Sequence, residues 1–244
     1  MLPVLNIGPL ALQVPGFVII IGIWLGLSLA ERFTKSIKPN VLYNLVLISL
    51  LSGVVGARLG YVLEFPAAFS DNPLNIASLN LDLFNLYAGL GVGLVVAIIY
   101  GQKKQLPFWS TLDALTPLFA KFLIAFSASN LASGNAYGSQ TELPWGIDLW
   151  GAYRHPTQVY DIILSSVILM AMIALLLKKK IYPDGMIFLV FLACTASARI
   201  FTEAFRGDST LIFNGIRSAQ FIAWLILAIS LWALGKRLLE RSVT

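Results

Sequence analysis

The sequence predicts an all-α integral membrane protein with about seven transmembrane helices, its amino terminus outside and its carboxyl terminus in the cytoplasm. Three observations predict this fold class. Hydrophobic residues fill 58% of the 244 positions and charged residues only 12%, and the mean hydropathy of +0.81 is far above that of an ordinary water-soluble domain. Apolar runs long enough to cross a bilayer recur along the chain. Basic residues gather in alternate connections between those runs.

Seven apolar runs account for the predicted helices, because a helix needs about 20 predominantly apolar residues to cross the hydrocarbon core. The third run is the shortest, and its ends are the hardest to define. A cleavable signal peptide is not expected, since the first ten residues contain no Lys or Arg. The predicted spans are Leu10 to Ala30, Val41 to Leu63, Leu86 to Tyr100, Phe108 to Ala132, Thr157 to Leu177, Gly185 to Phe205 and Ile212 to Leu234.

The distribution of Lys and Arg orients the spans, because cytoplasmic connections accumulate basic residues. The loop from Glu64 to Asn85 has none, and the loop from Ser133 to Pro156 has only Arg154, so both are expected outside. The net charge of +5 suits anionic lipid headgroups and gives no case for nucleic acid. Basic residues follow the first, third, fifth and seventh spans, at Arg32, Lys35, Lys38, Lys103, Lys104, Lys178, Lys179, Lys180, Lys236, Arg237 and Arg241.

One membrane domain is expected to account for residues 1–244, since no internal repeat, low-complexity tract or water-soluble segment is visible. The two long connections lie on the outer side, whereas the cytoplasmic connections are short. The second long connection is rich in Gly, Trp and Tyr, a composition typical of the depth of the lipid headgroups. The lone Cys194 excludes an intramolecular disulfide. The lone His155 cannot form a histidine metal site by itself. No metal and no cofactor is expected.

Arg199, Glu203 and Arg206 are the first candidates for a functional site. They are four and three residues apart and therefore share one helix face at the edge of the sixth span. An ionisable side chain inside a span costs at least about 2.5 to 3.5 kcal/mol on insertion scales, so it normally faces protein or a wet cavity. The other charged residues expected in the outer half of the membrane are Arg58, Arg154 and Asp161.

Two interpretations of these charges are open. In the structural one, Glu203 neutralises Arg199 or Arg206. Arg58 would then pair with Asp161. In the functional one, four arginines against two nearby carboxylates leave positive charge unbalanced. Because a guanidinium matches a phosphate bidentately, an anionic phospholipid headgroup would bind there. We favour the functional interpretation, since intramembrane ionisable residues usually mark functional sites.

Four stretches of the chain form a recognisable series: GARLGYVL (Gly56 to Leu63), ELPWG (Glu142 to Gly146), RHPTQVYD (Arg154 to Asp161) and RIFTEAFRGD (Arg199 to Asp208). In this order and spacing they resemble the bacterial prolipoprotein diacylglyceryl transferase family, from about Pro9 to the last span. A closing segment around Gln220 is similar as well. The resemblance implies a seven-span inner-membrane enzyme that moves diacylglyceryl from phosphatidylglycerol to the cysteine thiol of a lipoprotein precursor, on the outer side.

The resemblance also implies roles for individual residues. Arg199 resembles the family's headgroup-binding arginine, Glu203 its polar partner, and Arg206 the arginine that closes the motif. Together with the charge pattern, it gives a phosphate-binding set of Arg58, Arg199, Arg206, Asn130 and Arg154. The lipid pocket would include Tyr61, Tyr87, Gly134, Gly138, Gln158 and Tyr160.

Four matching positions depart from the family pattern. Tyr87 stands where the family has the histidine of His-Gly-Gly, so the usual general-base candidate is missing. Ser127 stands in place of an arginine, Asn135 in place of a glutamate and Pro15 in place of a tyrosine. The acceptor thiol, with an unperturbed pKa of about 8.5, must lose its proton. Tyrosine, with a pKa of about 10, is a poor base at neutral pH, so His155 or Glu203 would have to act beside Arg199.

Two functions remain open at this point. The first is a divergent transferase, which the retained motifs favour. Its partners would be phosphatidylglycerol or another anionic phospholipid and a lipoprotein precursor, in the bacterial cytoplasmic (inner) membrane. The second is a non-catalytic family member, a lipid-binding scaffold or an accessory subunit with partners in a larger membrane complex, which the substitutions favour. A transporter is disfavoured, because no inverted repeat or broken mid-membrane helix pair is visible.

Overall fold

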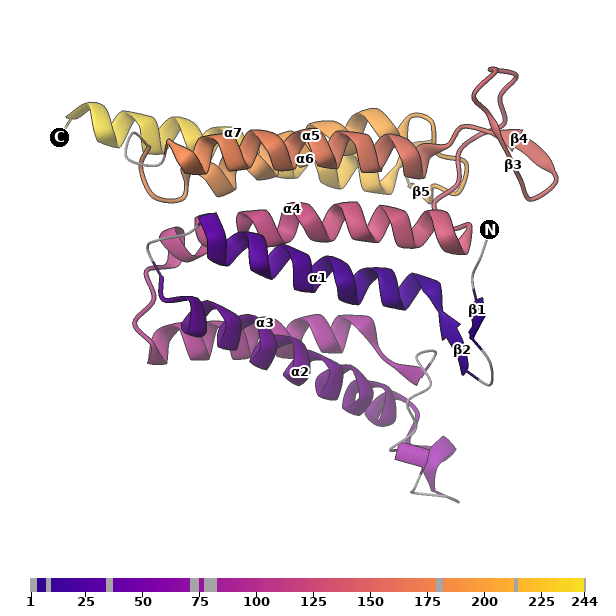
Figure 1. Cartoon of the computed structure of the whole chain (residues 1–244), viewed down its shortest axis with the longest axis horizontal. Helices are drawn as coiled ribbons and strands as arrows, with labels where there is room; N and C mark the ends of the chain where they lie inside the picture. The colour runs from indigo at the N-terminus through magenta and orange to yellow at the C-terminus, as the bar shows by residue number, and fades with distance from the viewer. Residues whose placement is uncertain are drawn as a thin grey trace. The chain divides into compact units, whose positions relative to one another are not determined.

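The computed structural model describes residues 4–7, 10–33, 37–70, 75–76, 83–178, 182–212 and 215–243. Within these residues, seven helices are long and apolar enough to cross a membrane, which confirms the all-α, seven-span prediction. Their orientation across the membrane stays a prediction. The helices, labelled in Figure 1, are α1 (Val14–Phe33), α2 (Pro39–Glu64), α3 (Leu86–Lys103), α4 (Phe108–Ser133), α5 (Thr157–Leu177), α6 (Met186–Glu203) and α7 (Ser218–Val243).

Short antiparallel hairpins interrupt the helical pattern, and two of them correct the predicted span boundaries. Leu10–Gln13 forms a strand, so the first helix begins at Val14 rather than at Leu10. Ile212 lies in another strand, so the seventh begins at Ser218. A short apolar run fits a strand as well as a helix, which is why periodicity alone placed these starts too early. The described strands are β1 (Val4–Ile7), β2 (Leu10–Gln13), β3 (Ile147–Leu149), β4 (Ala152–Arg154), β5 (Leu211–Ile212) and β6 (Ile216–Arg217).

The chain divides into two compact units. Residues Ser36–Thr111 form the hairpin unit, which contains α2 and α3. Residues Met1–Lys35 and Leu112–Thr244 form the five-helix unit, which contains α1 and α4 to α7. The expectation that residues 1–244 make a single domain therefore stays a prediction.

In the hairpin unit, glycines let α2 and α3 approach each other closely. A Cβ on Gly56 would lie 2.5 Å from the Cβ of Val92, and a Cβ on Gly89 would lie 2.8 Å from the backbone oxygen of Gly53. Small residues at such interfaces are how membrane helices associate, because lipid chains leave little hydrophobic driving force between helices. The glycines of the GARLG stretch thus serve helix packing.

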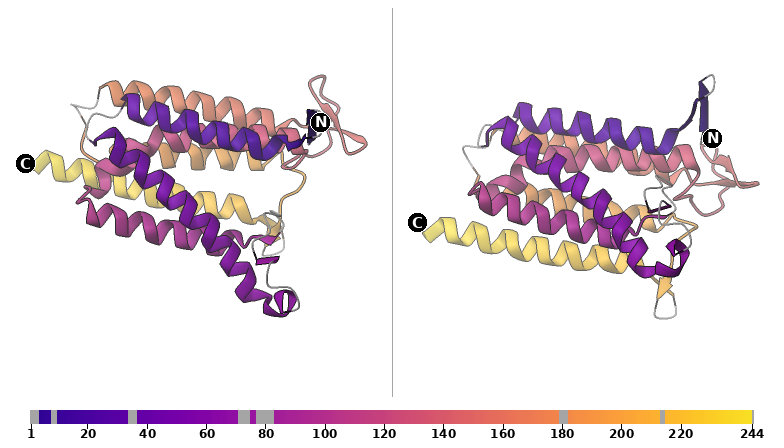
Figure 2. Two further views of the ribbon diagram at one scale, coloured as in Figure 1. Left: turned by 60° about the horizontal axis from the view of Figure 1, so that its bottom comes forward. Right: turned by 90° about the horizontal axis from the view of Figure 1, so that it is seen from below.

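In the five-helix unit, α6 packs against both α5 and α7, and Figure 2 shows these helices running side by side in two further views. Asp113 of α4 fixes the start of α6. Its carboxylate is fully buried and accepts hydrogen bonds from the backbone N–H groups of Gly185 at 2.7 Å and Phe188 at 2.8 Å. A negative charge that satisfies the first N–H groups of a helix also complements the positive end of its dipole.

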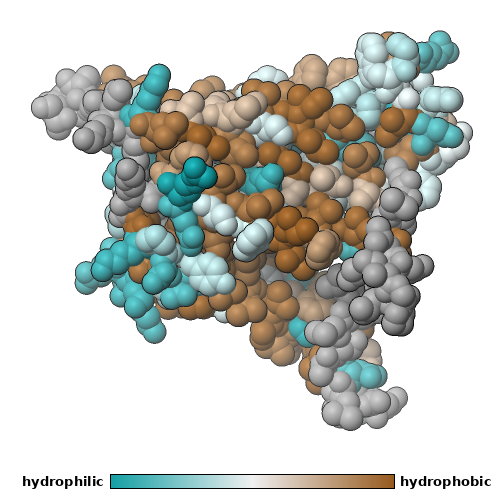
Figure 3. Space-filling model, viewed as in Figure 1, coloured by the Kyte–Doolittle hydropathy of each residue, from teal (hydrophilic) through white to brown (hydrophobic). Residues whose placement is uncertain are grey.

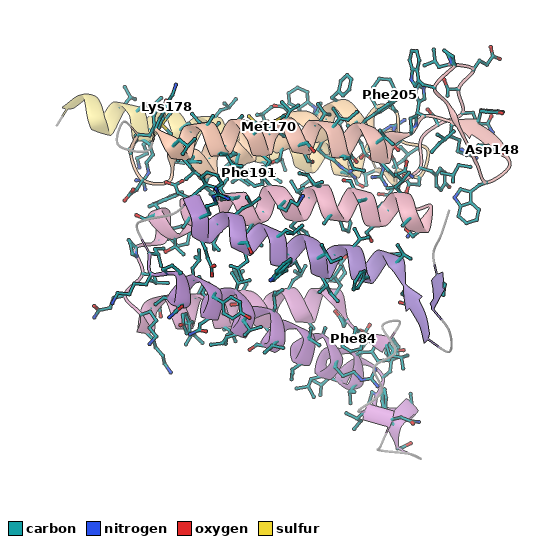
Figure 4. All side chains as sticks on the ribbon, viewed as in Figure 1. Phe84, Asp148, Met170, Lys178, Phe191 and Phe205 are labelled. Carbon is teal, nitrogen blue, oxygen red and sulfur yellow. The ribbon has the colours of Figure 1, made fainter. Side chains whose placement is uncertain are left out.

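The two ends of the five-helix unit are packed differently. Figure 4 labels Lys178 near one end and Phe205 near the other. Toward the Lys178 end, side chains of α4, α5 and α6 form a compact apolar cluster. Figure 3 shows the brown, hydrophobic surface along the helices and teal, hydrophilic residues mostly toward their ends, as expected for helices that meet lipid. The buried members of the cluster are Ala120, Ile168, Leu169, Met172, Leu176, Ile187 and Phe191.

Candidate functional site

Toward the other end of the five-helix unit, residues of α4, α5, α6 and α7 line a partly open cavity of about 860 Å³. We call it the amphipathic cavity. Its apolar wall is rich in phenylalanine and includes Phe119, Phe122, Phe126, Phe188 and Phe191. Its polar lining consists mainly of Ser127, Asn130, Asn135, Asp161, Arg199, Arg206 and Asp208.

Arg199 is held by Glu203 and remains accessible. Its Nη2 lies 3.0 Å from Oε2 of Glu203, whose side chain is only 1% exposed, whereas the Arg199 side chain is 37% exposed. The distance from its Nη1 to Oδ2 of Asp161 is 3.9 Å, too long for a hydrogen bond. The other oxygen of Glu203 accepts a hydrogen bond of 2.6 Å from Ser209 Oγ. Because a guanidinium carries five N–H donors, Arg199 keeps donors for a ligand in the cavity.

Arg206 has a carboxylate partner that the sequence analysis missed. Its Nε and Nη2 each lie 2.9 Å from an oxygen of Asp208, a bidentate pair just beyond the end of α6. Counting Asp208 with Asp161 and Glu203, the carboxylates near this helix end are more numerous than the sequence analysis assumed. Because Asp208 pairs with Arg206, that arginine is less available to a ligand. Arg199 is therefore the cavity cation most available to an anionic guest.

Arg217 of β6 is a second residue that the sequence analysis missed. Its Nη1 donates to the backbone oxygens of Glu203 and Arg206, the latter at 2.8 Å, and to Ser209 Oγ at 3.3 Å. A cation bound to the last carbonyls of a helix complements the negative end of its dipole. The signal that could have found it is a basic residue standing immediately before the last apolar run.

Arg58, Tyr61 and Tyr87 lie in the hairpin unit, and their relation to the amphipathic cavity stays a prediction. The Arg58 guanidinium is buried, sits over the rings of Phe69 and Phe84, and donates to three backbone oxygens. The acceptors are those of Asn75 at 2.5 Å, Leu83 at 2.7 Å and Ile76 at 2.8 Å. Arg58 therefore anchors the connection between α2 and α3.

Tyr61 and Tyr87 differ in how far their own unit covers them. The Tyr61 ring packs against Phe65, with the ring centroids 4.9 Å apart. Tyr87, at the position where the resemblance expects a histidine, is 85% exposed. Tyr87 thus has little contact with the rest of its own unit.

The predicted residues of the loop after α4 mostly build the loop itself. Arg154 donates to the backbone oxygens of Leu149 at 3.0 Å and Gly138 at 3.4 Å, and its guanidinium lies 4.9 Å from the centre of the Tyr137 ring. Gly138 is required by close packing, because a Cβ there would lie 2.6 Å from the Cβ of His155.

Gly134 begins this loop, and Gln158 of α5 holds it. Gly134 ends α4 with a φ of +80°, a left-handed conformation that glycine adopts without strain. Gln158 is fully buried and donates to the backbone oxygen of Asn135 at 2.7 Å.

Three other positions singled out in the sequence line the amphipathic cavity: Ser127, Asn130 and Asn135. Two of the positions that depart from the family pattern, Ser127 and Asn135, therefore lie at the amphipathic cavity.

His155 lies in a second cavity, of about 450 Å³, which we call the aromatic pocket. Its Nδ1 is 3.3 Å from the Tyr160 hydroxyl, which also accepts a hydrogen bond of 3.0 Å from Trp145 Nε1. Phe201, another lining residue, follows Arg199 by two positions and so points about 200° around α6 from it. The residues that line the aromatic pocket are Leu143, Trp145, His155, Tyr160, Ile163, Leu164, Phe201 and Phe205.

The structure therefore does not bring all the predicted catalytic residues together. Arg199 and Glu203 form an ion pair at the amphipathic cavity. His155 lines the aromatic pocket on another side of α6. Of the residues described as lining the two cavities, Leu164 alone is shared.

Comparison with known proteins gives one consistent answer. The family model described as prolipoprotein diacylglyceryl transferase matches residues 3–235. A phosphatidylglycerol–prolipoprotein diacylglyceryl transferase of Solidesulfovibrio magneticus is 31% identical, over 95% of this chain and 92% of the relative. Proteins of the same name from Bordetella parapertussis (34% identity, 69% of this chain and 68% of the relative) and Lactobacillus gasseri (26% identity, 96% and 90%) are also similar.

Proposed function

Because the chain belongs to the prolipoprotein diacylglyceryl transferase family, we propose that it transfers diacylglyceryl from phosphatidylglycerol to the cysteine thiol of a lipoprotein precursor. The observation that carries the proposal is the amphipathic cavity, which joins arginines to a phenylalanine-rich wall inside one bundle of membrane helices. A phospholipid has the same division into an anionic head and apolar chains. As the sequence predicts, the protein would work in the bacterial cytoplasmic membrane, with this end of the helices outside.

Arg199 is the proposed phosphate-binding residue, supported by Arg206. A guanidinium binds phosphate oxygens through charge-assisted hydrogen bonds, which are strong where water is excluded. Buried Glu203 fixes the orientation of Arg199 through their 3.0 Å contact. In the reaction, the thiolate sulfur forms a bond to the glyceryl carbon, and the bond from that carbon to the phosphate oxygen breaks. Glycerol phosphate leaves with the bonding electrons, and Arg199 stabilises the charge that it gains.

Asp161 is the proposed acceptor of the thiol proton. It lines the amphipathic cavity and lies 3.9 Å from Arg199. The other two carboxylates already have arginine partners. Asp208 is paired bidentately with Arg206, and Glu203 is almost fully buried against Arg199. This proposal replaces the role that the sequence analysis gave to His155, which lines the aromatic pocket instead.

The proposal is tested with the purified full-length protein in lipid nanodiscs. Phosphatidylglycerol with a labelled headgroup and a peptide carrying a lipoprotein-precursor cysteine should yield labelled glycerol phosphate and a peptide heavier by one diacylglyceryl group. Binding of the lipid is measured separately by native mass spectrometry. Binding without release at high protein concentration overturns the transferase proposal and leaves a lipid-binding scaffold, while release from Arg199→Gln at the parent rate removes the proposed site.

A further inference from the structure

The amphipathic cavity has a defined depth. Along α6 its lining runs from Arg199 to Phe188, and along α4 it runs from Asn130 to Phe119. Each interval is eleven residues, which at 1.5 Å per residue is about 16 Å. One leaflet contributes about half of a hydrocarbon core that is about 30 Å thick. Two helices thus independently give the cavity the depth of a single leaflet.

Three aromatic rings gather at the deep end of the cavity. The ring of Phe119 lies 6.0 Å from that of Phe188 and 6.4 Å from that of Phe191, and the rings of Phe188 and Phe191 are 6.3 Å apart, all between centroids. Figure 4 labels Phe191, which lies on the side of α6 next to α4. Ring pairs at these distances attract each other. The three rings, which we call the aromatic floor, therefore form one contiguous layer.

The aromatic floor rests on the compact apolar cluster. Phe191 belongs to that cluster, and Phe119 and Phe188 pack against it. Directly within the cluster, Met172 and Ile187 are fully buried. Protein interiors of this kind are close-packed, and forcing an extra group into one is destabilising. A chain that reaches the aromatic floor cannot extend further without that cost.

We propose that the aromatic floor sets the acyl-chain length of the lipid that the cavity accepts. The inference rests on the proposed function for the identity of the lipid as a diacyl phospholipid donor. With the phosphate held at Arg199, a chain that ends at Phe119 and Phe188 fills the cavity. A longer chain has to bend out of it, and a shorter chain leaves apolar space unfilled. Phe188 is the residue to alter, since it is less buried than Phe191.

The test is competition among saturated phosphatidylglycerols of graded chain length for the full-length protein, read by native mass spectrometry. Phe188→Ala deepens the cavity, and the distribution of bound lipids should shift toward longer chains. The shift for each added methylene should be smaller than the roughly fourfold expected for transfer from water, because the competing chains already lie in lipid. Phe188→Trp raises the floor and should move the preference toward shorter chains. Two substitutions with opposite expected signs keep the test decisive if one of them folds poorly.

Phe122→Ala is the matched control. Phe122 also lines the cavity from α4, but it lies one turn nearer Asn130 and stacks on Phe126, so it belongs to the wall. Its loss should weaken binding of all chain lengths alike. Identical length profiles for Phe188→Ala, Phe122→Ala and the parent overturn the inference. Because the readout is binding, a shifted profile in a protein that releases no glycerol phosphate would remove the transferase proposal and leave the aromatic floor in place.

Discussion

The two ends of the five-helix unit share helices but are packed differently: one end is closely packed, and the other contains a cavity. Toward Lys178, Met172 and Ile187 are fully buried in a compact apolar cluster. Toward Arg199, the helices line the amphipathic cavity, and charged groups are part of that lining. Close packing at one end supplies the stability that a hollow, charged end cannot contribute. The difference teaches that the unit concentrates its packing in one half so that the other half can hold a ligand.

Helix α6 links the two halves and is fixed at both of its ends by charges from other elements. Asp113 binds its first N–H groups, and Arg217 binds the backbone oxygen of its last residue, Glu203, and that of Arg206 just beyond it. Each charge has the sign that complements the helix dipole at that end. Arg199 and Glu203 are therefore carried by a helix that cannot easily slide or rotate. A fixed helix is what a site needs when its arginine must meet a phosphate in one orientation.

The largest effect is expected at the hollow end, from Arg199→Gln. The change removes the most available cavity cation and the closest charged partner of Glu203, so the rate of glycerol phosphate release should fall about 100-fold to 1,000-fold. Binding of phosphatidylglycerol should weaken as well. Arg199→Lys keeps the charge but loses the planar fork, and it should recover only part of the activity. A full recovery with lysine would mean that charge alone, without bidentate geometry, is sufficient.

Asp161→Asn should have the next largest effect, and it should lower kcat without weakening lipid binding. If Asp161 accepts the thiol proton, kcat should fall about 100-fold while KM for phosphatidylglycerol stays near the parent value. Asp161→Glu should retain part of the rate, because the carboxylate is preserved. The measurement is the split between kcat and KM together with the pH dependence of kcat. A rise in KM with kcat unchanged would assign Asp161 to lipid binding only.

At the packed end, Asp113→Asn should lower stability and leave catalysis unchanged. One of the two N–H groups that Asp113 holds loses its acceptor in a buried place, which costs about 1 to 3 kcal/mol. The midpoint of thermal unfolding in detergent should fall, and the kcat of the folded protein should match the parent. Glu142→Gln, the same charge change at an exposed position of the loop after α4, is the control and should leave the midpoint in place. A drop in kcat would show that the two halves are not separable.

Much of the fold could be predicted from the sequence, because hydrophobicity sets membrane helices directly. The fifth span was predicted with its observed bounds, Thr157–Leu177, since Pro156 precedes it and lysines follow it. The predicted starts of α1 and α7 were wrong, because Leu10, Leu12 and Ile212 are apolar and yet lie in paired strands. Strand pairing depends on a partner segment that no local pattern identifies.

The site was predictable where it depends on helix spacing and not where it depends on the path of a loop. Arg199 and Glu203 were expected on one helix face from their numbers alone, and they form an ion pair. Asp208 lies beyond the helix end, where a turn brings it back to Arg206. His155 follows a β-hairpin, and the course of that loop directs it to the aromatic pocket. Neither position follows from periodicity.

The smallest expected effect, from His155→Phe, is the one that separates the two cavities. Phenylalanine keeps the ring beside Phe205, 5.1 Å away between centroids, and loses the contact with the Tyr160 hydroxyl. If proton acceptance belongs to the amphipathic cavity, glycerol phosphate release should change by no more than about tenfold, since a single neutral hydrogen bond contributes only about 0.5 to 1.5 kcal/mol. A fall of about 100-fold in kcat, with Asp161→Asn near the parent rate, would return the role of base to His155. It would also require His155 to reach the cavity of Arg199 by a movement of the loop after α4, which protection of that loop from hydrogen exchange, with and without lipid, would reveal.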